Sequence, residues 1–485
     1  MKKLNELLAP WVPHITADCV ISGLQNDSRK VKAGDLFLAY PGAVTDGRLF
    51  IPQAVQAGAA AVIYDPELLP ASALPLADAI PCLAMAKLSC KLPDIAGRFY
   101  DYPANALAVT GVTGTNGKTT VAYLLTQAYE LFGKSAAYIG TLGEGPTTNI
   151  KALGNTTPDA LRLQSLFFDY KQAGIRQICM EVSSHALCQG RVDGVNFSQA
   201  IYTNLSHEHL DYHHTMEAYA AAKAQLFAKS TLQYAIVNAD DRYAALMTAR
   251  LATNCRKITY GINTPCDVRA VNWQVNRSGS VMEVHSPWGI HHLQINTLGL
   301  FNIYNNLAVF ASLLSAGFPA AETVEMMSKL QAAPGRMEVI AKEPCVIVDY
   351  AHTPDALENV LAALSKLKQG RLITVFGCGG DRDKAKRPMM GKIASQYADS
   401  LIITSDNPRT EDPIQIIEEI NQGVLPTVKV HKIVERKQAI AEALNNASHD
   451  DIVLIAGKGH EDYQQIGMKR VNFSDQKVVR ELLQR

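Results

Sequence analysis

The sequence predicts an α/β fold made of three domains. Its 485 residues correspond to about three domains of ordinary size. Hydrophobic residues make up 47% of the chain, which is enough for sizeable cores. In the middle and last parts, short apolar runs alternate with helix-like stretches, a pattern typical of parallel sheets covered by helices on both faces. We therefore expect domains at residues 1–88, 89–333 and 334–485.

The first domain is predicted to be a small α/β unit. Strand-like runs at Asp35–Ala39 and Ala59–Tyr64 flank a helix-like stretch at Ile51–Ala57. A loop-rich connection follows, marked by four prolines, Pro66, Pro70, Pro75 and Pro81.

The middle domain is predicted to hold a mainly parallel sheet. It opens with a buried strand at Ala106–Val112, and a helix over Val121–Phe132 follows a Gly/Thr/Asn loop. Residues 267–298 alternate like antiparallel strands and predict a small side sheet. Further strands are expected at Ala136–Ile139, Gln177–Met180, Ala200–Thr203 and Ala235–Val237.

The last domain is predicted to be a Rossmann-like, doubly wound unit. One stripe of a helix between the first two strands carries Leu357, Val360, Leu361, Leu364 and Leu367. Its strands are expected at Val346–Val348, Leu372–Phe376, Leu401–Thr404 and Ile452–Ala456.

Composition excludes several classes of function. Lys+Arg and Asp+Glu both number 46, so the formal net charge is zero, which argues against nucleic acid or an anionic membrane as the main partner. No run of about 18 apolar residues occurs that could span a bilayer. The nine cysteines lack C-x-x-C spacing and predict free thiols in a reducing cytoplasm.

The strongest motif runs from Gly111 to Thr120 and joins a predicted strand to a predicted helix. Glycines let the backbone wrap phosphate groups, and the helix N-terminus adds N–H donors and a positive dipole end. The strict Walker pattern has glycine where this chain has Val112, so the match is to a shifted variant; a ligand-free turn is the alternative. The motif predicts that ATP, with Mg²⁺, is bound by Gly114, Thr115, Asn116, Gly117, Lys118, Thr119 and Thr120.

Two polar stretches follow other strands of this domain. Glu181 stands at a strand end, where a carboxylate suits Mg²⁺; an acid facing solvent is the alternative. Residues 207–214 hold four histidines, which suggests a metal or phosphate site, or else a solvated loop. Lys223 lies in a helix-like stretch, Met216–Lys229, and its residue type alone predicts a surface position.

Four polar loops follow the predicted strands of the last domain, so they should meet at one edge of its sheet. They are Asp349–His352, Gly377–Arg382, Asp406–Arg409 and Gly457–Glu461.

Together these motifs resemble the Mur ligase family, the ATP-dependent amide-forming enzymes of bacterial peptidoglycan synthesis. Asp406–Arg409 resembles the amino-acid selectivity motif of the members that add meso-diaminopimelate, whereas lysine-adding members typically lack the arginine. Gly42–Asp46 departs from the His-Gln-Ala form of some members. The matching pieces cover nearly the whole chain: Gly114–Thr120, Glu181–His185, Thr203–His213, Phe301–Asn305, Pro334–Glu338, Asp349–Asp355 and Asp406–Arg409.

The resemblance implies a role for each matching residue. Lys118, Glu181, His209 and Lys223 would be catalytic. Mg²⁺ would be bound by Thr119, Glu181, His209 and Lys223, the last carried as a carbamate. ATP would also be contacted by four further residues, Asn305, Arg336, Asp349 and His352. The UDP-N-acetylmuramoyl dipeptide would be held by Asn26, Ser28, Asn155, Thr156, Thr157, Ser183, Gln189 and Arg191. Meso-diaminopimelate would be held by Arg382, Asp406, Asn407, Pro408, Arg409, Gly457 and Glu461.

Three other functions remain open at this stage. A lysine-adding or folate-polyglutamating ligase is the nearest, and Asp406–Arg409 argues against both. A P-loop motor on nucleic acid is disfavoured by the zero net charge. A non-catalytic nucleotide-binding regulator is disfavoured by Glu181, His209 and Lys223. We expect a monomer, with no nucleic-acid partner and no membrane insertion.

Overall fold

The computed structural model describes all residues except 14, 16–17, 43–44, 71–79 and 485. Ala43, Val44 and Pro75, which the sequence analysis mentions, lie outside the described residues. The chain divides into two compact units. The first holds Met1–Gly114, Gly133–Ala235 and Ala245–Arg256, and the second holds Thr115–Phe132, Ile236–Ala244 and Lys257–Arg485.

The first unit begins with a small parallel sheet that confirms the α/β prediction for this region. Its strands run in the order β3 (Gly23–Gln25), β4 (Asp35–Ala39), β5 (Ala61–Tyr64) and β6 (Cys82–Ala84). Helix α2 (Ile51–Gln56) contributes Ile51 and Ala54 to one core beside Phe37, and α1 (Leu4–Leu8) and α3 (Leu88–Phe99) contribute to another. A short antiparallel pair, β1 (Lys2–Lys3) and β2 (Val20–Ile21), precedes the sheet.

The first unit also holds the parallel strands that follow the loop-rich connection. β11 (Phe197–Tyr202), β7 (Ala108–Thr113), β10 (Gln177–Glu181) and β8 (Ala136–Gly140) lie side by side in parallel, and β9 (Gly143–Gly145) ends the order antiparallel to β8. These strands are almost wholly buried, as expected of a sheet with helices on both faces. The unit's helices include α5 (Ala160–Gln172), α6 (Ser184–Cys188), α7 (Leu210–His213) and α8 (Met216–Ala224).

Two expectations for the middle of the chain need correction. β14 (Val268–Asn276), β15 (Gly279–Ser286) and β16 (Gly289–Ile295) are antiparallel as predicted. They do not form a separate side sheet, because β13 (Arg256–Gly261) pairs with β14 and continues into the ten-stranded sheet through β12 (Tyr234–Asn238). The helix expected over Met216–Lys229 ends at Ala224, since the backbone N–H groups of 226–228 bond three residues back and tighten the chain into turns.

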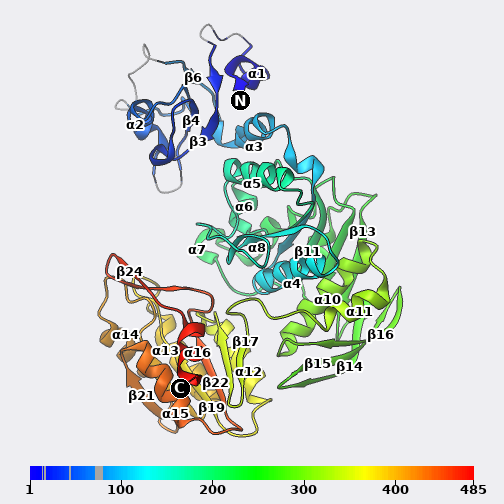
Figure 1. The fold of residues 1–485 in the computed structure, drawn as a ribbon, viewed down its shortest axis with the longest axis vertical. Helices are drawn as coiled ribbons and strands as arrows, with labels where there is room; N and C mark the ends of the chain where they lie inside the picture. The colour runs from blue at the N-terminus through cyan, green and yellow to red at the C-terminus, as the bar shows by residue number, and fades with distance from the viewer. Residues whose placement is uncertain (14, 16–17, 43–44, 71–79, 485) are drawn as a thin grey trace. The chain divides into compact units, whose positions relative to one another are not determined.

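The second unit contains the predicted doubly wound sheet (Figure 1). Its six strands run in the order β17 (Glu338–Lys342), β18 (Cys345–Asp349), β22 (Ile452–Ala456), β19 (Leu372–Phe376), β20 (Ser400–Thr404) and β21 (Lys429–Ile433). All neighbours after the β17–β18 pair are parallel. The carboxyl ends of β18, β22, β19 and β20 therefore share one edge, which confirms that the four polar loops meet there.

Helices cover both faces of this sheet. Residues of α12 (Pro354–Ser365), α13 (Lys386–Tyr397) and α14 (Pro413–Asn421) share one core with Ile347, Phe376 and Leu454. Residues of α15 (Arg436–Asn446) and α16 (Asp475–Leu483) share the other with Val348 and Val375. Thr353 accepts from the Ala356 N–H at 3.4 Å and Pro354 follows it, which explains where α12 begins. The predicted stripe residue Leu367 lies beyond the end of α12.

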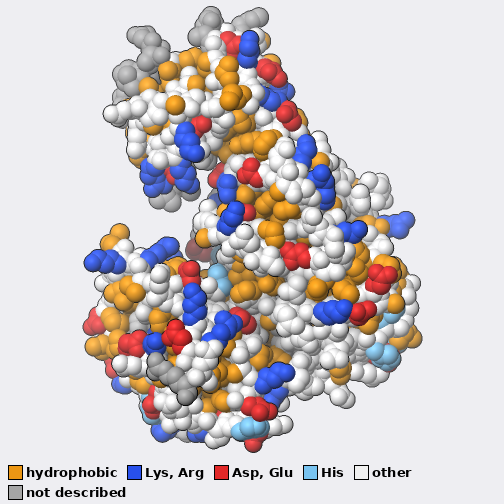
Figure 2. Space-filling model, viewed as in Figure 1, with side chains coloured by type: hydrophobic (Ala, Val, Ile, Leu, Met, Phe, Trp, Pro, Cys, Tyr) orange, Lys and Arg blue, Asp and Glu red, His pale blue; other side chains and the backbone are white. Residues whose placement is uncertain are grey.

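The second unit also contains α4 (Lys118–Leu131), α10 (Leu300–Ser315), α11 (Ala320–Met327) and the hairpin β23 (Tyr463–Ile466)–β24 (Lys469–Asn472). None of the helices in the described ranges has both the length and the apolar character needed to cross a bilayer. On the face drawn in Figure 2, basic and acidic side chains are interspersed.

Candidate active site

The Gly-rich loop lies between β7 and α4, as the motif predicts. Gly114 has φ +152°, and a Cβ built on it would lie 1.9 Å from Thr203 Oγ1, so a side chain is excluded there. Gly117, with φ +88°, precedes the first residue of α4, Lys118. Lys118 Nζ donates to the Thr115 carbonyl at 2.8 Å. The backbone therefore turns sharply into a helix N-terminus, the arrangement that binds phosphate groups.

Arg336 lies beside the loop within the second unit. Its Nη2 donates to Thr119 Oγ1 at 3.4 Å, and its guanidinium carbon lies 4.5 Å above the Tyr350 ring. Its Nε is buried, and none of the residues that the structure describes hydrogen-bonds it. Asp349 accepts from the Met337 and Ala351 N–H groups, both at 2.7 Å. Burial raises the pKa of Asp349, and the charge of Arg336 opposes that rise.

Of the two other residues assigned to ATP, His352 joins this contact group through Tyr350, since the centroids of the two rings are 4.5 Å apart. Asn305 is buried on α10, where its Nδ2 donates to Asn302 Oδ1 at 2.9 Å. His352 is exposed, and its Nδ1 lies 2.8 Å from the Tyr350 carbonyl oxygen.

Glu181 is 1% exposed, so the solvent-facing alternative is wrong. It ends β10, and its carboxylate accepts from the Tyr138 hydroxyl and from the Thr141 backbone N–H at 2.8 Å. The Thr141 hydroxyl is 3.3 Å from the second carboxylate oxygen. Three donors thus fix the orientation of this acid.

Lys223 is 1% exposed, so the surface position predicted from its residue type alone is wrong. Its Nζ donates to the Gly114 carbonyl at 2.8 Å and lies 4.6 Å from the centre of the Tyr219 ring. The lysine is therefore directed at the beginning of the Gly-rich loop.

Histidines and tyrosines surround Tyr219. His209 meets its ring edge to face at 5.9 Å between centroids, and His213 stacks on it at 4.9 Å. The centroid of the His185 ring lies 5.0 Å from that of His209 and 4.2 Å from that of Tyr212. Burial, followed by the neighbouring positive groups, lowers the pKa of His213 to about 4, so this ring is neutral at pH 7. His209, in contrast, is exposed.

The residues assigned to the sugar-peptide substrate form a connected polar network. Thr157 Oγ1 donates to the Glu181 carbonyl at 2.8 Å and accepts from the Ser183 N–H at 3.1 Å. Arg191 donates to the Thr157 carbonyl at 2.9 Å and to Gln189 Oε1 at 2.6 and 2.9 Å. The Thr156 hydroxyl lies 3.1 Å from that of Thr141.

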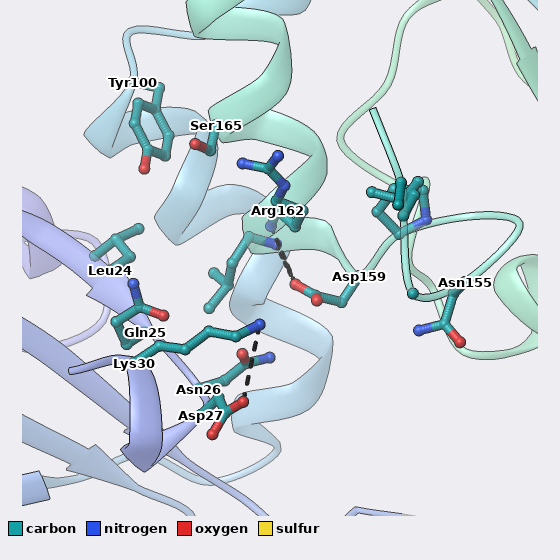
Figure 3. A pocket seen from close by; sticks show the side chains of 15 residues that line it. Leu24, Gln25, Asn26, Asp27, Lys30, Tyr100, Asn155, Asp159, Arg162 and Ser165 are labelled. Carbon is teal, nitrogen blue, oxygen red and sulfur yellow. Dashed lines mark hydrogen bonds and ion pairs between the residues drawn. The ribbon is translucent and has the colours of Figure 1, made fainter. Parts of the chain in front are cut away.

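A pocket of about 450 Å³ contains two more of these residues, Asn26 and Asn155 (Figure 3). Two basic residues, Lys30 and Arg162, and two acidic residues, Asp27 and Asp159, also line it, and Lys30 lies 3.8 Å from the Asp27 carboxylate. Ser28 lies outside this lining and donates to Gln53 Oε1 at 2.8 Å.

In the second unit, the loops after β20 and β22 interlock. A Cβ on Gly457 would lie 2.7 Å from Asp406 Oδ2, so the two loops can approach this closely only with glycine. Asn407 Nδ2 donates to Glu461 Oε2 at 2.8 Å. Lys458 donates to the same carboxylate oxygen at 2.9 Å and to Asn407 Oδ1 at 3.1 Å.

Arg409 is half-buried next to the loop after β19. Its Nη1 donates to the Gly380 carbonyl at 2.5 Å. Its backbone has φ +53° and is held by the β23–β24 hairpin, through its own N–H to the Gln465 carbonyl and the Gly467 N–H to its carbonyl. Pro408 is buried, whereas Arg382 is exposed.

Several residues of these contact groups could not be recognised from the amino-acid sequence. Lys458 was seen only as part of a polar loop, and its complete burial shows that its charge is used internally. Tyr138 and Thr141, which hold Glu181, carry no pattern in the sequence. Tyr219 is one tyrosine among 18, and only the fold places it under Lys223.

Comparison with known proteins gives matches over most of the chain. Three family models match: "Mur ligase family, catalytic domain" at residues 20–87, "Mur ligase middle domain" at 112–313 and "Mur ligase, glutamate ligase domain" at 335–459.

Among similar proteins is the UDP-N-acetylmuramoyl-L-alanyl-D-glutamate–2,6-diaminopimelate ligase of Pseudomonas syringae pv. tomato, 45% identical and covering 95% of both chains. The protein of the same name from Pseudomonas putida is 44% identical over 96% of both. A solved structure with that name superposes with a TM-score of 0.71, at 37% identity and 98% coverage of both chains.

Proposed function

The chain belongs to the Mur ligase family, and we propose that it adds meso-2,6-diaminopimelate to UDP-N-acetylmuramoyl-L-alanyl-D-glutamate. The reaction would form the UDP-N-acetylmuramoyl tripeptide of peptidoglycan and convert ATP to ADP and phosphate. This activity is that of an acid–amino-acid ligase.

The loop Asp406–Arg409 carries this proposal. It follows β20 at the sheet edge where Gly457 and Glu461 also lie. Meso-diaminopimelate differs from lysine in having a second amino-acid head with its own carboxylate. The planar guanidinium of Arg409 matches a carboxylate, and Glu461 is an acceptor for an ammonium group.

ATP supplies the activation that amide formation needs, since an acid and an amine at neutral pH form a salt. The D-glutamate γ-carboxylate would attack the γ-phosphate of ATP, giving an acyl phosphate and ADP, and the amine of diaminopimelate would then displace phosphate. Both reactants of the first step are anions, so Lys118, Arg336 and the N–H groups of the Gly-rich loop would reduce their repulsion. Because the P-loop holds β- and γ-phosphates, it favours this route over an adenylate.

Mg²⁺ would be held by Thr119, Glu181, His209 and Lys223. The hydroxyl and carboxylate suit this hard cation, but the amine of Lys223 is itself a cation and fits only as a carbamate. The described residues contain no cluster of three or more His, Cys, Asp or Glu side chains that would bind a metal without it. When bound, Mg²⁺ would neutralise phosphate charge.

The remaining assignments follow from the same proposal. We place the UDP-dipeptide in the pocket with Asn26 and Asn155 and along the network from Thr157 to Arg191. We further propose domain boundaries after residues 88 and 333, a monomer, and action in the cytoplasm. The cysteines in the described ranges are thiols rather than disulfides, which supports a reducing compartment.

Phosphate release with each amino acid in turn tests the proposal. Purified protein should release phosphate from ATP only when both the UDP-dipeptide and meso-diaminopimelate are present, and mass spectrometry should find the tripeptide. Turnover with lysine instead would identify a lysine-adding ligase, and turnover with glutamate and a folate would identify a folylpolyglutamate-type ligase.

A further inference from the structure

Lys458 is the basic residue at the centre of the loops after β20 and β22. Its side chain is fully buried. A buried ammonium group must be compensated by partners, because its hydration is lost. Its partners are Glu461 Oε2 at 2.9 Å, Asn407 Oδ1 at 3.1 Å and the Tyr463 ring, whose centre is 5.4 Å from Nζ.

These contacts fix the orientation of the Asn407 amide. Oδ1 accepts from Lys458 and also from the Gln465 N–H at 2.9 Å, while Nδ2 donates to Glu461 at 2.8 Å. A flipped amide would turn its NH₂ group towards the lysine ammonium and its oxygen towards the carboxylate, replacing two attractive contacts with two repulsive ones. The cation of Lys458 therefore acts together with the Gln465 N–H and the Glu461 carboxylate to hold the Asn407 amide in this orientation.

The same contacts fix one oxygen of Glu461 and leave the other available. Both bonds end on Oε2. Within the described ranges, no residue hydrogen-bonds Oε1. Gln465 links this carboxylate to Arg409: it accepts from the Arg409 N–H at 3.1 Å and donates its own N–H to Asn407, which bonds Glu461.

We propose that Lys458 is a positioning residue that holds Asn407 and Glu461 so that Glu461 Oε1 receives an ammonium group of the amino-acid substrate. This inference rests on the proposed function and deepens it. Lys458 and Glu461 balance in charge, and the guanidinium of Arg409 on the neighbouring loop is a cation for a substrate carboxylate. The site therefore favours a substrate that presents an ammonium and a carboxylate together.

Steady-state kinetics of Lys458→Met tests this role. Methionine keeps the length of the side chain but loses its charge, and the KM for meso-diaminopimelate should rise about tenfold or more, equivalent to about 1.4 kcal/mol. The KM values for ATP and the UDP-dipeptide should stay within about twofold. Lys469→Met, at an exposed position on the nearby hairpin, is the matched control and should behave as wild type.

A double variant separates positioning from a contribution to folding. Lys458→Met combined with Glu461→Gln leaves no unpaired buried charge, so it should fold even if the single variant does not. If Lys458 acts through Glu461, the KM for diaminopimelate should lie within about threefold of that of Glu461→Gln alone. Two results would overturn the inference. One is a double variant whose KM for diaminopimelate rises by the product of the two single effects. The other is a folded Lys458→Met variant with an unchanged KM for diaminopimelate. Wild-type protein that turns over no diaminopimelate would instead refute the proposed function.

Discussion

Arg436 and Asp475 form an ion pair in which both side chains are fully buried. Two bonds of 2.8 Å join Nε to Oδ1 and Nη2 to Oδ2. Arg436 Nη2 also donates to the Ala456 carbonyl at 3.0 Å, at the end of β22 immediately before the loop that carries Lys458. The pair therefore ties the beginnings of α15 and α16 to the strand that supports the proposed amino-acid site.

Removing one partner of this pair should destabilise the protein strongly. Asp475→Ala leaves the Arg436 charge buried without its carboxylate, and this should lower the free energy of unfolding by about 3–5 kcal/mol. Urea unfolding followed by circular dichroism measures the loss. Glu481→Ala is the matched control, because Lys437 and Glu481 pair at 3.0 Å between the same two helices but are 45% and 57% exposed. That change should cost at most about 1 kcal/mol, and equal losses in both variants would contradict the prediction.

Gly114→Ala should abolish ligation through a steric clash. The new Cβ would lie 1.9 Å from Thr203 Oγ1 and 3.1 Å from the Asn204 backbone, so the loop must move. A displacement of about 1 Å at a catalytic group costs about 100-fold in rate. Gly133→Ala provides the control, because Gly133 also has a positive φ, +71°, but nothing lies within 4 Å of its added Cβ. The measurement is product formation by both variants, normalised to the amount of folded protein. Equal activity of the two variants would contradict the prediction.

Lys223→Ala should also be inactive, with partial recovery when small carboxylates such as acetate are added. The buried space beside Gly114 and Tyr219 would admit a free acid in place of the proposed carbamate. Lys223→Arg should fail as well, because a guanidinium does not form this carbamate. Lys229→Ala, which removes a partly exposed lysine paired with Asp193, should stay active. Full activity of Lys223→Ala without added carboxylate would refute the carbamate role.

The strands of this protein could be predicted from the sequence more accurately than the contacts between its side chains. β4, β19 and β22 begin and end at the predicted residues because each is a short apolar run bounded by polar or turn residues. The Gly-rich loop was predictable because few residues other than glycine tolerate its backbone. The burial of Lys223 could not be predicted, since the sequence of an Ala-rich helix does not indicate which of its faces is buried. The resemblance placed Lys223 beside His209 as a metal ligand, whereas its observed contacts are with the Gly114 carbonyl and the Tyr219 ring.

Arg409 provides the sharpest test of the amino-acid site. Its Nη1 donates to the Gly380 carbonyl at 2.5 Å. No described residue accepts from its other guanidinium N–H groups, so they can bind a substrate carboxylate. A charge-assisted hydrogen bond contributes about 1.5–3 kcal/mol, which corresponds to about 10- to 150-fold in kcat/KM. Arg409→Ala should therefore lose diaminopimelate use by at least this range.

The backbone conformation at residue 409 makes alanine a suitable replacement for Arg409. Alanine and arginine face the same cost at φ +53°, so the change removes the guanidinium with little added strain. The KM for ATP should change little, because we propose that the nucleotide binds at the Gly-rich loop. Lysine use need not appear, because the proposed pocket would still be shaped for a longer zwitterion. Arg470→Ala removes an exposed guanidinium that stacks 4.4 Å above Tyr463 and should leave all three KM values unchanged. If Arg409→Ala kept the wild-type kcat and KM for diaminopimelate, the substrate carboxylate would have to be bound elsewhere in this protein.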